Sequence, residues 1–186
     1  MPPGKRYISA QELLEDSFRL AVNIYSSGYR PRLIVGIWRG GTPVGIAVQE
    51  YFEYRGASTD HIAIRAASYT GINEQSDTVK VDGLEYVVEH AGDDEPLLLV
   101  DDVFDTGRSM AAVIEDLSGM IGSDCRKRAR IACPWYKPGK NRTKLVPDYF
   151  LHETEDWLVF PHELAGLTEE EIAKGKPGVA GILEKG

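Results

Sequence analysis

The sequence is poor in cysteine and has no long apolar run. Its two cysteines, Cys125 and Cys133, belong to no CxxC pair and to no histidine-rich segment, so we predict neither a zinc site nor a disulfide framework. A membrane-spanning helix needs roughly 18 consecutive apolar residues, and runs such as Leu97–Val100 are far shorter. The basic residues near the N-terminus are followed by no apolar stretch, so we expect no secretory signal and a cytoplasmic protein.

An excess of positive charge is also lacking. Lys and Arg total 21 against 29 Asp and Glu, which gives a net charge of -8, so we expect neither nucleic acid nor a membrane as a partner. The chain has 186 residues, of which 42% are hydrophobic and 27% charged, as is typical of one globular domain. We therefore predict a single domain over residues 1–186.

Turn residues and apolar periodicity predict alternating helices and strands. Ser9 and Glu12 form a capping-box pattern ahead of apolar residues at helical spacing. The expected helices span residues 10–27, 44–54, 84–91 and 108–121, and the expected strands span residues 32–38, 61–66, 97–100 and 129–135. This alternation indicates an α/β fold with a doubly wound, mainly parallel sheet. The polar stretch 69–82 is predicted to be a mobile loop.

After residue 135 the sequence pattern changes. A basic loop, Lys137-Pro-Gly-Lys-Asn-Arg, precedes short aromatic strands near residues 148–151 and 157–160. We interpret residues 136–163 as a small hood lobe, with the sheet core at about residues 7–135 and a C-terminal tail at residues 164–186.

Residues 97–109 carry the strongest chemical signal. An aliphatic strand ends at Asp101 and Asp102, and ligands bind at the carboxyl ends of strands in open α/β sheets. The following Asp105-Thr-Gly-Arg-Ser is typical of a loop whose N–H groups bind phosphate at a helix start. Adjacent carboxylates suit the two hydroxyls of a ribose or a magnesium ion. The segment therefore predicts a sugar phosphate site.

Competing phosphate motifs do not match the spacing of these residues. A single Asp would more readily be a helix cap, but three Asp with Thr-Gly-x-Ser favour a ligand site. A haloacid-dehalogenase-type phosphatase needs Asp-x-Asp, whereas Asp101 and Asp102 are adjacent. Gly36 and Gly41 have P-loop spacing, but Thr42 stands where the lysine is required. No Gly-x-Gly-x-x-Gly opens a helix after a strand, so a dinucleotide site is unsupported.

Residues 97–109 resemble the phosphoribosyl pyrophosphate (PRPP) signature of type I phosphoribosyltransferases. Three further segments follow in that family's order. Gly36-Ile-Trp-Arg-Gly-Gly is similar to its pyrophosphate loop, Ala67-Ser-Tyr-Thr-Gly to the start of its flexible loop, and residues 146–150 and 157–163 to its base-recognition hood. With Lys137-Pro before it, the hood is most similar to that of 6-oxopurine enzymes of the xanthine-guanine and hypoxanthine-guanine type. The resemblance covers about residues 7–163.

The resemblance implies the type I fold, Mg²⁺ as cofactor, a dimer or tetramer, and a purine-salvage reaction in which a purine nitrogen displaces pyrophosphate from PRPP. Asp105 would handle the proton at the purine N7 as general acid or base. Arg39 and Gly40 would bind pyrophosphate, and Ser68 and Tyr69 would belong to a flexible loop that excludes water. The implied residues for the ribose and 5′-phosphate are Asp101, Asp102, Asp105, Thr106, Gly107, Arg108 and Ser109.

The resemblance also implies contacts with the purine base and the metal. Lys137 would donate to O6, Trp157 would stack on the ring, and the backbone of Leu158 would contact the opposite edge. Asp102 and Glu163 would bind the metal. Two of these residues have simpler alternatives, with Trp157 in the core and Lys137 in a solvated basic loop. His162 departs from the aromatic residue expected in the xanthine-guanine group, which leaves the preferred base open.

Two alternative functions stay open at this point. One is a regulatory protein of the same fold that senses PRPP or a nucleotide without turnover. The other is a transferase of the same fold that acts on a pyrimidine.

Overall fold

The computed structural model describes residues 4–69, 78–92, 95–122 and 124–184, and its elements alternate as the sequence predicts. The helices are α1 (Ala10–Ser26), α2 (Gly41–Tyr54), α3 (Leu84–His90), α4 (Arg108–Ile121), α5 (Glu169–Gly175) and α6 (Pro177–Leu183), with a short 3-10 helix at Cys125–Lys127. The strands are β1 (Lys5–Tyr7), β2 (Leu33–Trp38), β3 (Asp60–Tyr69), β4 (Thr78–Asp82), β5 (Leu97–Val100), β6 (Val103–Phe104), β7 (Ala129–Ala132), β8 (Trp135–Tyr136), β9 (His152–Glu153) and β10 (Trp157–Val159).

The chain divides into two compact units, with one boundary within α1 and the other between Glu155 and Asp156. The larger unit is Leu14–Glu155, and the smaller unit combines Met1–Leu13 with Asp156–Gly186. Residues 136–155 of the predicted hood thus group with the sheet, whereas residues 156–163 group with the N-terminal segment.

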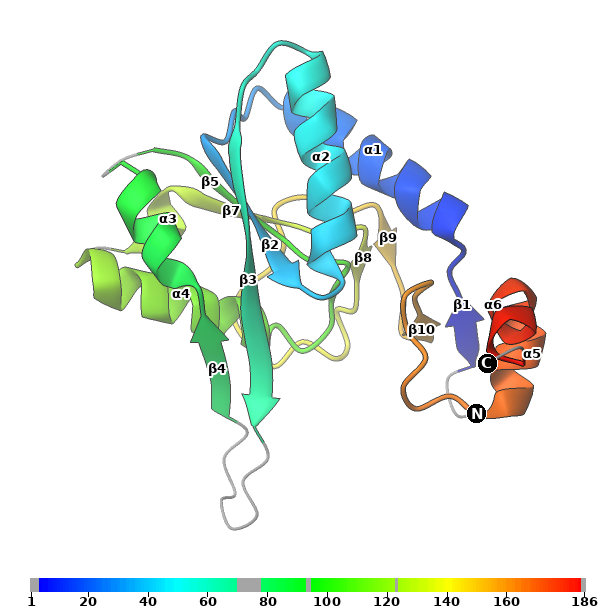
Figure 1. The fold of residues 1–186 in the computed structure, drawn as a ribbon. Helices are drawn as coiled ribbons and strands as arrows, with labels where there is room; N and C mark the ends of the chain where they lie inside the picture. The colour runs from blue at the N-terminus through cyan, green and yellow to red at the C-terminus, as the bar shows by residue number, and fades with distance from the viewer. Residues whose placement is uncertain (1–3, 70–77, 93–94, 123, 185–186) are drawn as a thin grey trace. The chain divides into compact units, whose positions relative to one another are not determined.

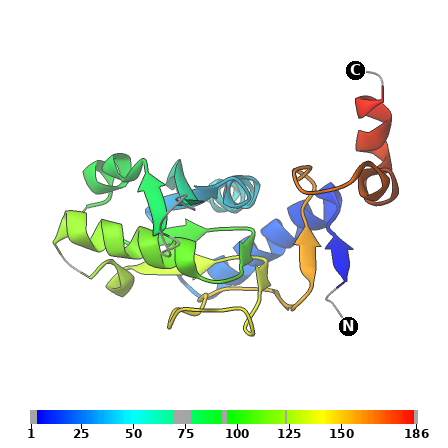
Figure 2. The ribbon, with the colours of Figure 1, turned by 90° about the horizontal axis from the view of Figure 1, so that it is seen from below.

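A five-stranded sheet organises the larger unit. Its order is β4-β3-β2-β5-β7, and all neighbours are parallel except β3 and β4. Figures 1 and 2 show α3 and α4 on one side of this sheet and α2 on the other. The prediction of a doubly wound, mainly parallel α/β sheet is confirmed. A second, three-stranded parallel sheet has the order β6-β8-β9.

Strand β5 lies inside the larger sheet with all four residues buried. Leu97 and Leu99 belong to the core cluster that contains Val113 and Leu117 of α4. Because successive side chains in a strand point to opposite faces, Leu98 and Val100 lie on the face that α2 covers. A continuous aliphatic run is thus explained by burial on both faces.

The prediction of a mobile loop over residues 69–82 is wrong for residues 78–82. Residues 78–82 form β4, which pairs antiparallel with the end of β3, where Ser68 lies opposite Val79 and Tyr69 opposite Thr78. The sequence Thr-Val-Lys-Val-Asp alternates apolar and polar residues, as expected of an edge strand. Residues 70–77 of the predicted loop lie outside the described residues.

The smaller unit contains a parallel pair of strands and two short helices. Strand β1 pairs with β10, and Ile8 N–H donates to the carbonyl of Val159 at 2.9 Å. Helix α5 begins with a capping box between Thr168 and Glu171, so the predicted tail at residues 164–186 is largely helical over its described part. Lys176 is buried and donates to the carbonyls of Phe160 and Pro161.

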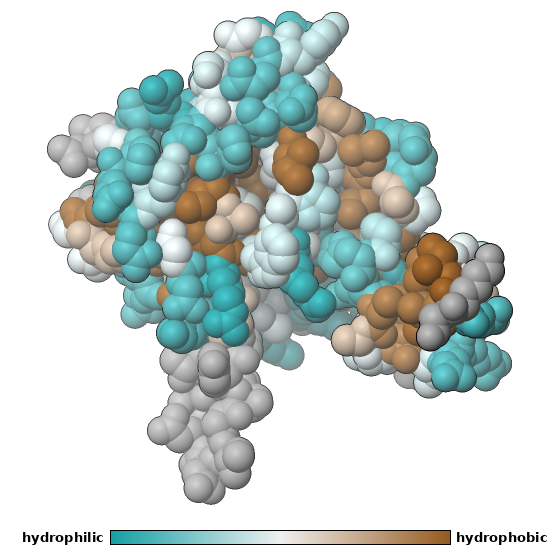
Figure 3. Space-filling view, in the orientation of Figure 1, coloured by the Kyte–Doolittle hydropathy of each residue, from teal (hydrophilic) through white to brown (hydrophobic). Residues whose placement is uncertain are grey.

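The surface of the larger unit is mostly hydrophilic in the view of Figure 3, with scattered apolar residues. Its exposed apolar side chains include Phe18 of α1 and Ile46 of α2, the latter 60% exposed. No helix within residues 4–69, 78–92, 95–122 and 124–184 combines the length and apolar character needed to cross a bilayer.

Candidate active site at the β2–β5 switch point

The predicted site residues that follow β2 and β5 lie where the strand order reverses. The chain passes from β2 outward to β3 and β4, and then returns to β5 on the other side of β2. Gly36 of β2 lies opposite Val100 of β5, so the residues after both strands emerge at one edge. Such a switch point is where ligands bind in open α/β sheets. Asp101 and Asp102 after β5 and residues 39–41 after β2, called here the glycine loop, therefore lie together at this edge of the sheet.

The glycine loop packs so closely on the end of β5 that side chains are excluded. A Cβ atom on Gly40 would lie 1.9 Å from Oδ2 of Asp102, and one on Gly41 would lie 2.2 Å from the carbonyl oxygen of Val100. Real Cβ contacts of this kind do not occur below 3.0 Å. The Gly-Gly pair is thus explained by close approach of the two strand ends.

The carboxyl group of Asp101 connects these segments. It accepts from the N–H of Asp102 at 3.0 Å and from the N–H of Gly41. Burial raises the pKa of the Asp101 carboxyl well above its usual range, and the neighbouring Asp102 charge acts in the same direction. Asp102 is itself buried, with 7% of its surface exposed. The strand end thus holds two adjacent acidic groups.

The loop of residues 105–109, called here the phosphate loop, leads into α4. Gly107 has a left-handed backbone with φ +76°, a conformation that side chains other than glycine rarely adopt. Thr106 and Arg108 are exposed, Ser109 is half-buried, and Arg108 N–H lies 3.4 Å from Thr106 Oγ1. The first N–H groups of a helix have no intrahelical partner and favour anions, so this loop has the geometry of a phosphate site.

Lys137 and Asp105, which are 32 residues apart in the sequence, form an ion pair. Lys137 Nζ donates to Asp105 Oδ2 at 2.8 Å. The Lys137 side chain is 6% exposed and that of Asp105 37% exposed. The alternative that Lys137 belongs to a solvated loop is therefore wrong. The pair places one hydrogen-bond donor and one acceptor side by side at the first residue of the phosphate loop.

The remaining predicted residues of the larger unit flank this region. Arg39 follows β2 and is exposed, and the peptide bond between Trp38 and Arg39 is cis. Ser68 and Tyr69, predicted to begin a flexible loop, are the last residues of β3 and pair with β4 through their backbone. Their contribution to a closing loop stays a prediction.

Three predicted residues belong to the smaller unit. Trp157 is 57% exposed, and Lys5 Nζ lies 5.7 Å above its ring centre, so the alternative that Trp157 is a core residue is wrong. Leu158 is buried, and its backbone lies in the β1–β10 pair opposite Arg6. Glu163 Oε2 accepts from Phe160 N–H at 3.0 Å. The role of Glu163 as a metal ligand stays a prediction.

The side chains of the described residues do not form a complete set of metal ligands by themselves. Within residues 4–69, 78–92, 95–122 and 124–184, no three His, Cys, Asp or Glu side chains lie close enough to hold a metal. Asp101 and Asp102 nevertheless offer carboxylate oxygens, which Mg²⁺ prefers, and Mg²⁺ commonly completes its shell with water and substrate oxygens. The donor set thus fits a magnesium ion held together with a substrate.

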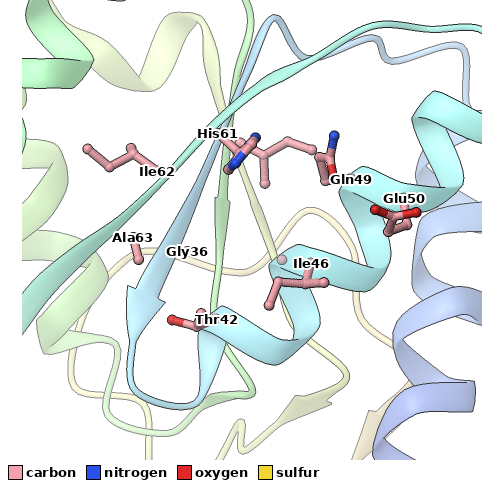
Figure 4. Close-up of a pocket in the computed structure, with 10 residues that line it drawn as sticks. Gly36, Thr42, Ile46, Gln49, Glu50, His61, Ile62 and Ala63 are labelled. Carbon is pink, nitrogen blue, oxygen red and sulfur yellow. The ribbon is translucent and has the colours of Figure 1, made fainter.

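A separate cavity of about 330 Å³ lies beside α2 and is lined by β2, α2 and β3 (Figure 4). Its lining includes Gly36, the first residue of the segment similar to the pyrophosphate loop, together with Thr42, Ile46, His61 and Ala63, but none of the residues to which a substrate contact is assigned. The candidate site is therefore the open edge at the strand ends and not this cavity.

Several residues that shape the site are absent from the set predicted from the sequence. Gly41 lies in the segment similar to the pyrophosphate loop but has no assigned role, although the Gly-Gly pair itself indicates close packing. Residues 137–145 are predicted only as a basic hood loop, but Asn141 and Thr143 form hydrogen bonds within it and Arg142 N–H donates to the carbonyl of Thr106. An Asn-x-Thr pattern in a loop is too common to indicate this.

Comparison with known proteins agrees with this geometry. The family model of the phosphoribosyl transferase domain matches residues 5–166. The purine phosphoribosyltransferase from Pyrococcus horikoshii Ot3 has a TM-score of 0.68 and 28% identity, over 88% of this chain and 97% of that chain. A hypothetical protein from Neisseria gonorrhoeae with bound ppGpp has a TM-score of 0.73 and 19% identity, over 96% of this chain and 99% of that chain. The Helicobacter pylori xanthine-guanine-hypoxanthine phosphoribosyltransferase has a TM-score of 0.66 and 21% identity, over 84% of this chain and 92% of that chain. At their lower identities, the latter two show similarity of fold.

Proposed function

The chain belongs to the phosphoribosyl transferase domain family, and on that premise we propose that it transfers the 5-phosphoribosyl group from PRPP to a 6-oxopurine. The products would be a nucleoside 5′-monophosphate and pyrophosphate. The membership itself places the chain among type I phosphoribosyltransferases, and purine enzymes are among its structural neighbours.

The ion pair between Lys137 and Asp105 is the observation that supports a 6-oxopurine as the substrate base. Its ammonium and carboxylate lie 2.8 Å apart, so they present a donor beside an acceptor. A 6-oxopurine has the complementary edge, with the acceptor O6 beside an N7–H donor. Adenine has an amino group in place of O6 and would leave the Lys137 ammonium without an acceptor.

The reaction would use the strand ends and the phosphate loop together. The 5′-phosphate would accept from backbone N–H groups at the start of α4, and Asp101 and Asp102 would accept from the ribose hydroxyls. A purine nitrogen would form the new bond to the anomeric carbon while the bond to pyrophosphate breaks and its electron pair leaves with pyrophosphate. The proton released by the purine would pass to the Asp105 carboxylate.

Several residues would hold the substrates for this step. Arg39 and Gly40 would bind the pyrophosphate, Trp157 would stack on the purine, and the Leu158 backbone would contact its far edge. Asp102 would bind the magnesium ion, and Glu163 is the second residue predicted to do so. When bound, this ion would neutralise charge on the pyrophosphate. The 5-phosphoribosyl transfer is expected to stop when Mg²⁺ is removed with a chelator and to return when it is restored.

The proposal is tested with a substrate panel of guanine, hypoxanthine, xanthine, adenine, uracil and orotate, with PRPP and Mg²⁺ present and pyrophosphate release as the readout. We expect turnover of at least one 6-oxopurine, with kcat/KM for adenine at least about 100-fold lower. No turnover of any 6-oxopurine would refute the proposal. Turnover of uracil or orotate instead would indicate a pyrimidine enzyme, and tight nucleotide binding without turnover would indicate a regulatory protein. Sedimentation of the same sample tests the predicted dimer or tetramer.

A further inference from the structure

Residues 137–145 lie against the phosphate loop and contact three consecutive residues that lead into and through it. Lys137 N–H donates to the carbonyl of Phe104 at 2.9 Å, and Lys137 Nζ donates to Asp105 Oδ2 at 2.8 Å. Arg142 N–H donates to the carbonyl of Thr106 at 2.9 Å. We call residues 137–145 the brace. Its contacts include two backbone carbonyls, so they restrain the loop itself and not only one side chain.

Asn141 organises the brace through its side chain. Its Oδ1 accepts from the N–H and from the Oγ1 of Thr143, both at 2.9 Å, and its Nδ2 donates to the carbonyl of Leu145 at 2.7 Å. Thr143 Oγ1 in turn accepts from Leu145 N–H at 3.2 Å. These bonds close the chain around Arg142 and direct its N–H toward Thr106.

The brace determines which way the N–H groups of the phosphate loop point. In a trans peptide the C=O and the following N–H point in opposite directions. With the carbonyl of Thr106 bonded to Arg142, the N–H of Gly107 faces away from the brace. The carbonyl of Phe104, bonded to Lys137, likewise turns the N–H of Asp105 away. Both N–H groups are thereby presented on the side opposite the brace.

The packing of Gly107 adds a second restraint. A Cβ atom there would lie 2.7 Å from ring atoms of Phe104 and 2.7 Å from Thr143 Oγ1. The Phe104 ring also packs edge-on against Tyr136, with centroids 5.6 Å apart. The Phe104 ring and Thr143 Oγ1 thus both close the space around Gly107.

We infer that Asn141 is a positioning residue for the 5′-phosphate. Asn141 acts through Arg142 and Thr143 on the N–H groups of the phosphate loop, and these N–H groups bind the phosphate. The inference rests on the proposed function of that loop. Asn141 itself touches no substrate in this scheme. Its loss would leave the carbonyl of Thr106 free to turn, which would misalign the Gly107 N–H without removing any group that binds the base.

The test compares variants of the whole chain by calorimetric titration with ribose 5-phosphate and by steady-state kinetics. Asn141→Ala is expected to raise the Kd for ribose 5-phosphate and the KM for PRPP roughly tenfold, a change of about 1.4 kcal/mol, with the KM for the purine within about twofold. Thr143→Val, which removes the hydroxyl but keeps the shape, should act in the same direction, and Thr143→Ser should restore binding. Lys144→Ala is the matched control, because it removes a neighbouring exposed charge and leaves the side chains of Asn141 and Thr143 intact.

Each outcome decides a different point. If the unaltered protein binds neither ribose 5-phosphate nor PRPP, the proposed function fails. If it binds them and Asn141→Ala binds within about twofold of it, the positioning role is refuted. If Asn141→Ala raises the KM for PRPP and the KM for the purine by the same factor and also lowers the melting temperature, the positioning role is likewise refuted. A merely structural role predicts that result. Should Asn141→Ala not fold, the difference between Thr143→Val and Thr143→Ser decides by the same criteria.

Discussion

Substitution of Gly107 by alanine tests the packing of the phosphate loop directly. Gly107 has φ +76°, and a Cβ atom there would meet Phe104 and Thr143 at 2.7 Å. Gly28 provides a matched control, because it has φ +87° with nothing within 4 Å of an added Cβ. The two positions therefore share the left-handed backbone and differ in the available space.

The expected magnitudes follow from this difference. A left-handed backbone costs an alanine about 1–2 kcal/mol relative to glycine, and forcing a methyl group into a packed site costs about 1–3 kcal/mol more. Gly28→Ala should thus lower the free energy of unfolding by about 1–2 kcal/mol, and Gly107→Ala by about 2–5 kcal/mol. The smaller entropy of the unfolded alanine chain affects both variants alike and cancels in the comparison.

Urea unfolding followed by tryptophan fluorescence measures both values, and the buried Trp135 is a suitable reporter. The same variants should be titrated with ribose 5-phosphate, for which we expect weaker binding by Gly107→Ala and unchanged binding by Gly28→Ala. If the two variants lose stability within about 0.5 kcal/mol of each other, less than the smallest overpacking cost, the packing argument at Gly107 is refuted.

Three further predictions concern catalysis, base binding and pH. Asp105→Asn should lower kcat at least about 100-fold while the Kd for PRPP changes by less than about threefold, and equal losses in both quantities would contradict a role in proton handling. Trp157→Ala should raise the KM for the purine by about 5-fold to 150-fold through lost stacking, whereas an unchanged KM would remove Trp157 from the base site. Tyr29 donates to the carbonyls of Leu97 and Arg128, and burial raises its pKa above the ordinary value of 10.0. Its contribution to stability is therefore present below pH 10 and is lost as the pH rises above 10. The free energy of unfolding should thus fall more steeply between about pH 9 and pH 11 in the unaltered protein than in Tyr29→Phe. Parallel curves for the two proteins would contradict this.

Much of the site was predictable because its signals are local. The aliphatic strand Leu97–Val100 has the same bounds in the sequence prediction and in the structure, and so does the helix Arg108–Ile121. Burial on both faces requires apolar residues throughout such a strand, and Asp101 and Asp102 then necessarily emerge at its carboxyl end. Alternation of strands and helices was likewise sufficient for the doubly wound sheet.

Other elements lack a local signal. Strand β4 has only five residues, so its apolar–polar alternation is too short to distinguish it from the polar stretch that precedes it, and it depends on pairing with β3. The strands β6, β8 and β9 have two residues each, and a segment of that length has no periodicity to detect. The helices α5 and α6 are also short, with seven residues each.

By itself the sequence determined the fold class and the order of the acids, the glycines and the phosphate loop, because these depend on neighbours in the chain. Only the tertiary structure decided which distant groups meet. It placed the Lys137 ammonium on Asp105, packed Gly40 against Asp102 and set the Arg142 N–H on Thr106. Such contacts join segments tens of residues apart, and their geometry depends on how the strand ends and loops pack, which no pattern within one segment encodes.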